Sequence, residues 1–268
     1  MLDVLRDRDF RRLFLADAAS QAGAQILMLA LPLVAVSALR ASPFETGALA
    51  MCQTLAFVLI GLPAGALVDR MRRRPVMIVA DLARAVALAS VPVAWWLGAL
   101  TIWQLYAVAL VLGCFTVFFD VAYQSYLPRL VGRDRLVQGN SALEVVRTVA
   151  QLGGPGAGGF LVQVLTAPFA LVVTVAGFAW SALCLGLIRK PEPRQDRNGG
   201  HLGKEIAQGV RFVLGHPLLR RVAGCTATAN LFSSMAQPMI MLLLARELGL
   251  GAGAIGLLLA AGGLGGLA

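Results

Sequence analysis

Long apolar runs separated by short polar segments make up most of the chain. The hydrocarbon core of a bilayer is about 30 Å thick, and a helix of about 20 apolar residues crosses it. Because lipid cannot satisfy exposed backbone polar groups, runs of this length are expected to be helical. The pattern therefore predicts eight spanning helices, near 13–39, 44–68, 75–99, 102–126, 142–166, 168–188, 222–245 and 252–268.

The composition supports this prediction. Hydrophobic residues make up 58% and charged residues 14% of the chain, and the mean hydropathy is +0.77. Soluble domains carry about one quarter charged residues. These values predict an all-α, polytopic membrane protein whose surroundings are the lipid bilayer.

The net charge of +9 follows membrane topology. With the N-terminus in the cytoplasm, only Arg40 and Arg246 lie outside, and the cations of the N-terminus, the other loops and the linker lie in cytoplasmic segments. This bias is the positive-inside rule, and it explains the charge without a nucleic-acid partner. We expect that the N-terminus is not a cleaved signal peptide, because Asp3, Asp7 and Asp9 interrupt its basic region.

Neither enzyme chemistry nor a metal site is indicated. Cys52, Cys114, Cys184 and Cys225 lie singly in different apolar runs, which argues against disulfides and metal clusters. His201 and His216 lie in a polar segment without partners at metal-ligand spacing. No nucleophile and base pair stands out, so we expect no catalytic residue, metal, cofactor or obligate protein partner.

A polar stretch after the sixth predicted helix divides the chain into halves. We expect a six-helix bundle at 1–189, a cytoplasmic linker at 190–221 and the start of a second bundle at 222–268. Apolar residues at helical spacing from Ile206 to Leu214 predict a short interfacial helix within the linker. A weak repeat supports two parallel halves: Arg11-Arg12 and Thr46–Leu49 recur 209 residues later.

Polar residues within the first predicted helix are candidates for substrate or proton binding. Asp17, Gln21 and Gln25 follow one another at four-residue steps and so share one face of the helix. We favour a face that lines a central cavity. The alternative is a hydrogen-bonded seam between two helices.

Further charges lie in the cytoplasmic third of later helices. Asp81 and Arg84 are three residues apart in the third helix, as are Glu144 and Arg147 in the fifth, so each can form an ion pair. With Asp120 of the fourth helix they predict a charge network close to the loop at 65–74. A structural latch is favoured over a substrate site, because paired charges near a membrane surface often anchor or gate.

That loop, GALVDRMRRR at 65–74, resembles the signature between the second and third helices of the major facilitator superfamily. The resemblance assigns close packing to Gly65, a helix-end acceptor to Asp69, and the cytoplasmic surface to Arg70, Arg73 and Arg74. Arg72 stands where the family usually has glycine. The alternative is a plain positive-inside stop signal.

The fifth helix carries GPGAGG at 154–159, which resembles the antiporter motif of facilitator drug exporters. The resemblance assigns this motif to Gly154, Pro155, Gly158 and Gly159; proline kinks a helix and glycines let a neighbour approach. A generic kink and packing seam is the alternative. The same residues fit G-x-G-x-x-G, but no strand precedes them, which excludes a dinucleotide site.

Segments 11–17, 119–128 and 140–144 further resemble the enterobactin-exporter and macrolide-efflux branch of bacterial members. The resemblance implies proton-coupled export of a small amphiphilic molecule, such as a drug, antibiotic or siderophore, across the bacterial cytoplasmic membrane. The usual proton-linked arginine of the fourth helix is Ala109 here, so Arg84 or Arg147 would have to replace it. A proton-independent carrier and a non-transporting fragment remain alternatives.

On the family pattern four more helices would follow, so we expect these 268 residues not to transport alone.

Overall fold

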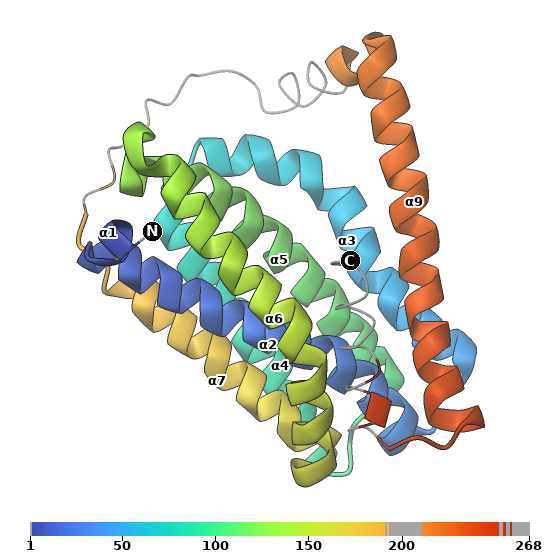
Figure 1. Ribbon diagram of the computed structural model, residues 1–268. Helices are drawn as coiled ribbons and strands as arrows, with labels where there is room; N and C mark the ends of the chain where they lie inside the picture. Colours follow the sequence, from blue (N-terminus) through green and yellow to red (C-terminus); the bar gives the residue numbers. More distant parts are fainter. Residues whose placement is uncertain (1, 191, 193–210, 252–253, 256–257, 259–268) are drawn as a thin grey trace.

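The computed structural model describes residues 2–190, 192, 211–251, 254–255 and 258. Every regular element among these residues is helical (Figure 1), which confirms the all-α fold class. The elements are α1 Leu2–Leu5, α2 Arg8–Leu39, α3 Pro43–Asp69, α4 Arg73–Trp96, α5 Ile102–Val131, η1 Arg133–Arg135, α6 Leu136–Leu165, α7 Ala167–Gly186, α9 Pro217–Leu242 and a π-helical turn, η2, at Leu243–Glu247.

The six helices α2 to α7 correspond to the first six predicted spans, and α9 corresponds to the seventh. Five of the described helices are long and apolar enough to cross a membrane: Arg8–Leu39, Pro43–Gly61, Arg73–Trp96, Ile102–Val131 and Ala167–Gly186. Most of the eighth predicted helix, and most of the predicted interfacial helix with His201, lie outside the described residues.

Helices continue past the apolar runs where polar side chains can cap them. The Asp7 carboxylate accepts from the Asp9 amide at 2.9 Å, so α2 begins at Arg8 rather than near 13. Ser42 and Glu45 form a capping box at the start of α3. In contrast, α4 ends at Trp96 rather than near 99, because the following turn places Gly98 at φ +67°.

Helix pairing determines where the bundle is closed. α2 packs on α6 and α7, α4 packs on α5 and α7, and α3 packs on α5. α5 and α6 share few contacts, although they are consecutive helices. The polar residues of α2, α4, α5 and α6 are therefore not sealed by helix packing at this position.

Glycines bring two of these pairs unusually close. A Cβ at Gly113 of α5 would lie 2.7 Å from the Cβ of Ala56 in α3. A Cβ at Gly154 of α6 would lie 2.3 Å from the Cβ of Gln25 in α2. Such close approaches are typical of helix packing in membranes, where small residues let backbones meet.

α9 stands apart from the six-helix bundle along much of its length. It runs beside α3 (Figure 1), and most of its described side chains are exposed. In this respect it differs from α2 to α7, which share two apolar cores, one toward each end of the bundle.

Candidate functional site

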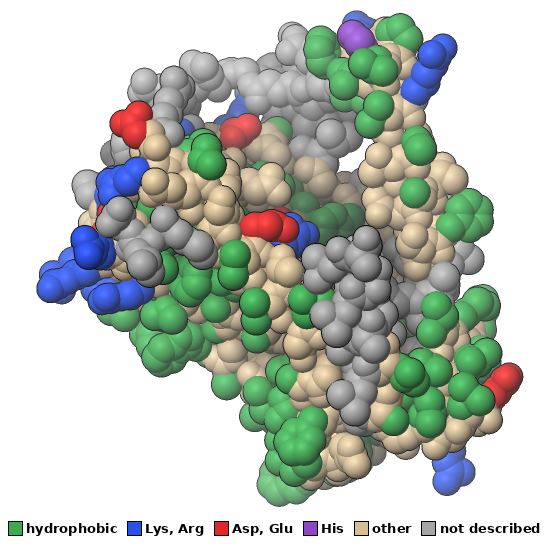
Figure 2. All heavy atoms as spheres, viewed as in Figure 1, with side chains coloured by type: hydrophobic (Ala, Val, Ile, Leu, Met, Phe, Trp, Pro, Cys, Tyr) green, Lys and Arg blue, Asp and Glu red, His purple; other side chains and the backbone are tan. Residues whose placement is uncertain are grey.

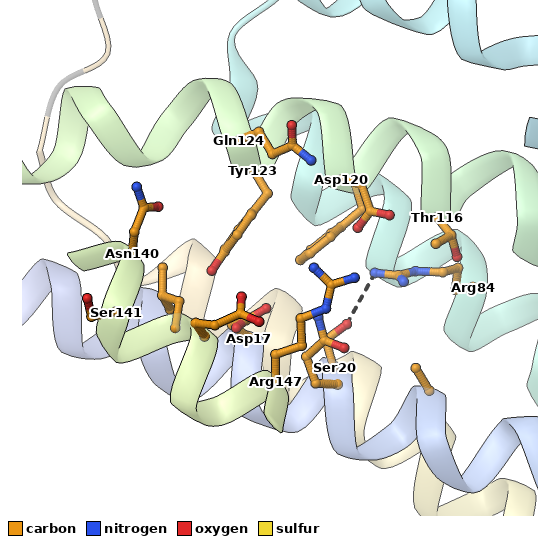
Figure 3. Close-up of a pocket in the computed structure, with 15 residues that line it drawn as sticks. Asp17, Ser20, Arg84, Thr116, Asp120, Tyr123, Gln124, Asn140, Ser141 and Arg147 are labelled. Atoms are coloured by element: carbon orange, nitrogen blue, oxygen red, sulfur yellow. Dashed lines mark hydrogen bonds between the residues drawn. The ribbon is translucent and has the colours of Figure 1, made fainter. Parts of the chain in front are cut away.

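A polar cavity of about 550 Å³ lies between α2, α4, α5 and α6 (Figure 3). Acidic and basic side chains adjoin near the centre of the face shown in Figure 2. The lining residues are Asp17, Ser20, Gln21, Ala24, Arg84, Thr116, Phe119, Asp120, Tyr123, Gln124, Asn140, Ser141, Leu143, Glu144 and Arg147.

Helical spacing explains how each segment contributes several side chains. Residues three or four apart share one helix face, as do Asp17 and Gln21 in α2. Asp120 and Tyr123 do the same in α5, and Glu144 and Arg147 in α6. Because α6 starts at Leu136, ahead of the predicted 142, Asn140 and Ser141 lie on the helix and line the same cavity.

Arg84 is held in a fixed position at the cavity wall. Its guanidinium pairs with Asp81 and donates to the Ser20 hydroxyl at 3.4 Å. It also lies 4.6 Å from the ring centroid of Phe119 and 4.5 Å from that of Phe178. Cation–π contacts of this kind gain strength when the charge is desolvated, and Arg84 is only 3% exposed.

The ion pair leaves two polar atoms unsatisfied. Asp81 Oδ2 and Arg84 Nε are buried without a hydrogen-bond partner among the described residues. Buried polar groups usually have partners, and exceptions often mark functional positions. The pair is thus a fixed charge couple with spare hydrogen-bonding capacity.

The second buried acid of the site is Asp17, which is 3% exposed. In Figure 3 the side chain of Tyr123 extends from α5 toward Asp17, across the cavity. The Tyr123 hydroxyl is buried beside the Asp17 carboxylate, and the two groups interact electrostatically. An acid and a phenol that face a polar cavity can both exchange hydrogen bonds with a bound molecule.

Acids outnumber bases around the cavity. Asp17, Asp120 and Glu144 line it with Arg84 and Arg147, and Asp81 stands behind Arg84. Asp120 is within electrostatic range of both arginines. In a medium of low dielectric, unbalanced negative charge favours the uptake of a proton or a cation.

The polar residues expected on one face of the first helix have different surroundings. Asp17 and Gln21 line the cavity, whereas Gln25 is packed against Gly154 of α6. Gln25 is therefore not a cavity residue, because the glycine lets α6 close over it. Its position is that of the helix–helix seam considered as the alternative.

The predicted charge network is brought together, but at the cavity and not at the signature loop. Arg84, Asp120, Glu144 and Arg147 join Asp17 around the polar space. The predicted position of these charges is close to Asp69 and Arg70. The partners found for Asp69 and Arg73 lie instead in the loop and the linker, since Arg73 pairs with both Asp69 and Glu192.

The signature loop is fastened by Glu192 from the linker. The Glu192 carboxylate accepts from the Arg73 amide at 2.7 Å and from the Arg74 amide at 3.2 Å, and so caps α4. Arg73 is 4% exposed and lies 3.6 Å from Asp69 and 4.0 Å from Glu192. Arg70 is the C-cap residue of α3. Around Gly65 the space is open in the described part of the chain.

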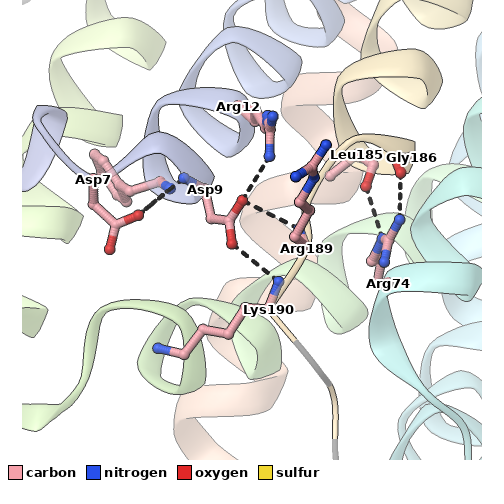
Figure 4. Close-up of polar contacts among 9 residues, drawn as sticks. Asp7, Asp9, Arg12, Arg74, Leu185, Gly186, Arg189 and Lys190 are labelled. Carbon is pink, nitrogen blue, oxygen red and sulfur yellow. Dashed lines mark hydrogen bonds and ion pairs between the residues drawn. The ribbon is translucent and has the colours of Figure 1, made fainter.

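The residues that follow α7, 187–190 and Glu192, form a strap across the helix ends. Figure 4 shows the contacts of Arg189 and Lys190 within it. Asp9 accepts from the amides of Arg189 and Lys190 at 3.2 and 3.0 Å. Lys190 Nζ donates to the Leu130 carbonyl at 2.6 Å. Arg74 donates to the Leu185 carbonyl at 2.8 Å and to that of Gly186. Part of the expected linker therefore ties together α2, α4, α5 and α7.

Glu192 is not among the site residues predicted from the sequence. It lies within the predicted linker at 190–221, although an acid between Pro191 and Pro193 directly after a spanning helix is a local signal. The capping role depends on a contact over 118 residues with Arg74. Only the folded chain brings the two segments together.

The glycine motif of α6 lies on the side that contacts α2. Pro155, Gly158 and Gly159 are buried. A Cβ at Gly158 would lie 3.3 Å from the Ile26 Cα. The motif thus forms the seam that closes the bundle beyond the cavity.

Among the described residues, no group of His, Cys, Asp and Glu is arranged to hold a metal ion. The polar atoms of the cavity come instead from carboxylates, guanidinium groups, amides and hydroxyls.

Comparison with known proteins agrees with this architecture. The sequence model of the Major Facilitator Superfamily matches residues 13–268. The multidrug efflux pump Tap of Mycolicibacterium fortuitum is 31% identical over 191 residues, which cover 68% of this chain and 46% of Tap. The enterobactin exporter EntS of Shigella dysenteriae serotype 1 is 27% identical over 80% of this chain and 51% of EntS. An uncharacterized MFS-type transporter of Bacillus subtilis, YfiS, is 25% identical over 75% of this chain and 48% of its own.

The chain spans about half the length of the curated relatives it matches. The predicted resemblance to enterobactin exporters is confirmed by the match to EntS. The family match covers the signature loop, the polar cavity and the glycine motif. The chain therefore belongs to the major facilitator superfamily and is a multi-pass membrane protein.

Proposed function

We propose that this chain is part of a transporter that exports a small amphiphilic molecule by alternating access, driven by the proton gradient. The observation that carries the proposal is the polar cavity of about 550 Å³ inside an apolar helix bundle. Ionisable residues at membrane depth are costly and usually mark a substrate or ion pathway. Tap is named as a multidrug efflux pump and EntS as an enterobactin exporter, which supports export.

The charges of the cavity support coupling to protons. Four acids, Asp17, Asp81, Asp120 and Glu144, face two arginines, Arg84 and Arg147. In our proposal Asp81 neutralises the immobile Arg84, and a proton or the cationic group of a substrate compensates the remaining acids. Competition between the two for the same carboxylates would couple proton entry to substrate release.

The residues have distinct proposed roles. Asp17 and Gln21 bind substrate or a proton from α2, and Tyr123 donates a hydrogen bond from α5. Glu144 and Arg147 lie on an exposed face of α6, where a bound molecule can reach them. Gln25 and the glycines of α6 shape the closed end of the cavity and do not contact substrate.

The proposed location is the bacterial cytoplasmic membrane, with the N-terminus and the linker from Lys190 to Arg221 in the cytoplasm. The positive-inside rule supports this orientation. The strap and the signature loop would then lie at the cytoplasmic surface, where the exposed side chains of Arg72, Arg189 and Lys190 remain hydrated.

The test is transport in an efflux-deficient bacterial host. A version extended through the downstream reading frame is expected to lower the accumulation of a fluorescent amphiphile in energised cells. Replacing Asp17 by Asn is expected to abolish the effect at unchanged membrane abundance. Equal accumulation with and without the protein would contradict the proposal.

Ala109 favours a second candidate, a proton-independent facilitative or uptake carrier. Ala109 is buried in α5, at the position where the resemblance to proton-coupled drug exporters predicts an arginine. Collapsing the pH gradient with an ionophore separates the two functions. Export that stops supports proton coupling, whereas flux that continues down the substrate gradient supports the facilitative carrier.

A further inference from the structure

Unusual backbone geometry is concentrated at the end of the bundle opposite the strap. Arg40, the C-cap residue of α2, has φ 53°, a left-handed conformation that is uncommon for a residue other than glycine. α9 does not end as an α-helix but continues as the π-helical turn Leu243–Glu247. Single π-helical turns often occur at functional positions.

A side-chain contact joins these two features. Arg246, within the π-helical turn, donates from Nη2 to the Ala41 carbonyl at 2.5 Å. Ala41 follows the left-handed Arg40 and is 3% exposed. The contact spans 205 residues and links the chain that follows the linker to the α2–α3 turn. We call it the Arg246–Ala41 clasp.

An apolar layer lies at the same end. Leu29 of α2 is 2% exposed and packs with Ile255, which is 1% exposed. Leu33, Leu244 and Leu250 pack against this pair. The layer lies farther along α2 than the cavity residues Asp17 and Gln21. The bundle is therefore closed at the layer, while the polar cavity lies between the layer and the strap.

We propose that Arg246 is a gate residue, which holds the extracellular ends of the two halves together while the cavity is accessible from the cytoplasm. This rests on the proposed function, because it assumes alternating access and a cytoplasmic N-terminus. One charge-assisted hydrogen bond to a carbonyl suits this role. It fixes the position of the π-helical turn, and it would break together with the apolar contact between Leu29 and Ile255 when the halves separate.

The first test is a disulfide cross-link across the apolar layer. In a chain whose four natural cysteines are replaced by Ala, Leu29→Cys and Ile255→Cys are expected to cross-link in membranes treated with an oxidant. Adding Arg246→Ala is expected to slow cross-linking severalfold. Arg246→Lys keeps a cationic donor and is expected to retain most of the rate.

Arg40→Asn is the matched control. It removes the other extracellular arginine, and asparagine tolerates the left-handed backbone. Its cross-linking rate is expected to equal that of the parent. Equal rates for Arg246→Ala, Arg40→Asn and the parent, at equal membrane abundance, would overturn the proposal.

The second test measures opening to the outside. The single Leu29→Cys variant is expected to react slowly with a membrane-impermeant maleimide in intact cells, and severalfold faster with Arg246→Ala. An increase confined to inverted vesicles would retain the gate and contradict the cytoplasmic N-terminus. An increase in intact cells, together with no export by the extended chain, would retain the gate and contradict the transport proposal. No increase in either preparation would contradict the gate.

Discussion

At the residue scale, Asp81 and Arg84 form an ion pair almost wholly withdrawn from solvent. Breaking a buried pair by removing one partner leaves an uncompensated charge and costs about 3–5 kcal/mol. Arg84→Gln is therefore expected to lower the thermal midpoint of the purified protein in detergent. Asp81→Asn combined with Arg84→Gln is expected to recover much of the loss, because neither charge is then stranded.

The double-mutant comparison separates pairing from packing. Arg84 also contacts the rings of Phe119 and Phe178, and those contacts are lost in both the single and the double variant. A double variant no more stable than Arg84→Gln would show that the aromatic contacts, and not the ion pair, stabilise this position.

A second single residue, Asp17, is predicted to act in transport and not in stability. It lines the cavity from α2 and lacks an arginine partner in its own helix. Asp17→Asn keeps the shape and removes the charge, so export by the extended chain is expected to fall at least tenfold, which corresponds to about 1.4 kcal/mol. Membrane abundance is expected to be near normal.

Asp134→Asn is the control for this experiment, because Asp134 is an exposed acid in η1, outside the cavity. It is expected to leave export unchanged. If Asp17→Asn lowered abundance and export in proportion, Asp17 would be a structural residue of the bundle.

At the element scale, the contact between α2 and α6 depends on a missing side chain. A Cβ at Gly154 would lie 2.3 Å from the Gln25 Cβ, whereas a Cβ at Gly153 meets nothing within 4 Å in the described chain. Gly154→Ala is expected to separate the helices and to cost about 1–3 kcal/mol through overpacking. Gly153→Ala, the adjacent control, is expected to be tolerated.

The measurement is the thermal midpoint of both purified variants, together with export by their extended forms. Equal thermal midpoints for Gly153→Ala and Gly154→Ala would contradict the close contact between α2 and α6 at Gly154.

Glu192 affects a whole helix, because it joins the strap to the start of α4. Arg72, the N-cap residue of α4, makes no side-chain cap of its own, and Glu192 caps the helix from the linker. Loss of a cap costs about 0.5–2 kcal/mol. Glu192→Ala is therefore expected to lower the thermal midpoint and to speed proteolysis of the linker.

Asp69→Asn provides the comparison within the signature loop. Its pair with Arg73 is 3.6 Å long and the Asp69 side chain is 70% exposed, and exposed pairs contribute about 0–1 kcal/mol. Asp69→Asn is therefore expected to lower the thermal midpoint less than Glu192→Ala does. A reversed order of the two variants would show that the loop aspartate, and not the linker glutamate, fixes the start of α4.

At the scale of the whole molecule, the proposed orientation determines which end of the bundle faces the cytoplasm. In the cysteine-free chain, Ala99→Cys in the turn between α4 and α5 is expected to react with an impermeant maleimide in intact cells. Gln195→Cys in the linker is expected to react only after the cells are opened. Labelling of position 195 from outside would reverse the orientation and exchange the roles of the strap and the clasp.

Some properties of the whole molecule could be predicted from local sequence. The spans of α2 to α7, the signature loop and the glycine motif each depend on residues close together in the chain. Hydropathy and helical periodicity act over one or two turns, and a lipid environment leaves the helix as the available form for each span. The membrane class and the family could therefore be recognised before any tertiary contact was known.

Only the tertiary structure decided which polar residues share a site. Asp17 and Gln21 meet Glu144 and Arg147 at the cavity, while Gln25 lies in the seam with Gly154. This division depends on how closely α2 and α6 approach, which periodicity within one helix does not specify. The contacts of Glu192 with α4 and of Arg246 with Ala41 join segments 118 and 205 residues apart. Contacts of this kind follow from the relative placement of packed helices, and so they become visible only when the whole chain is folded.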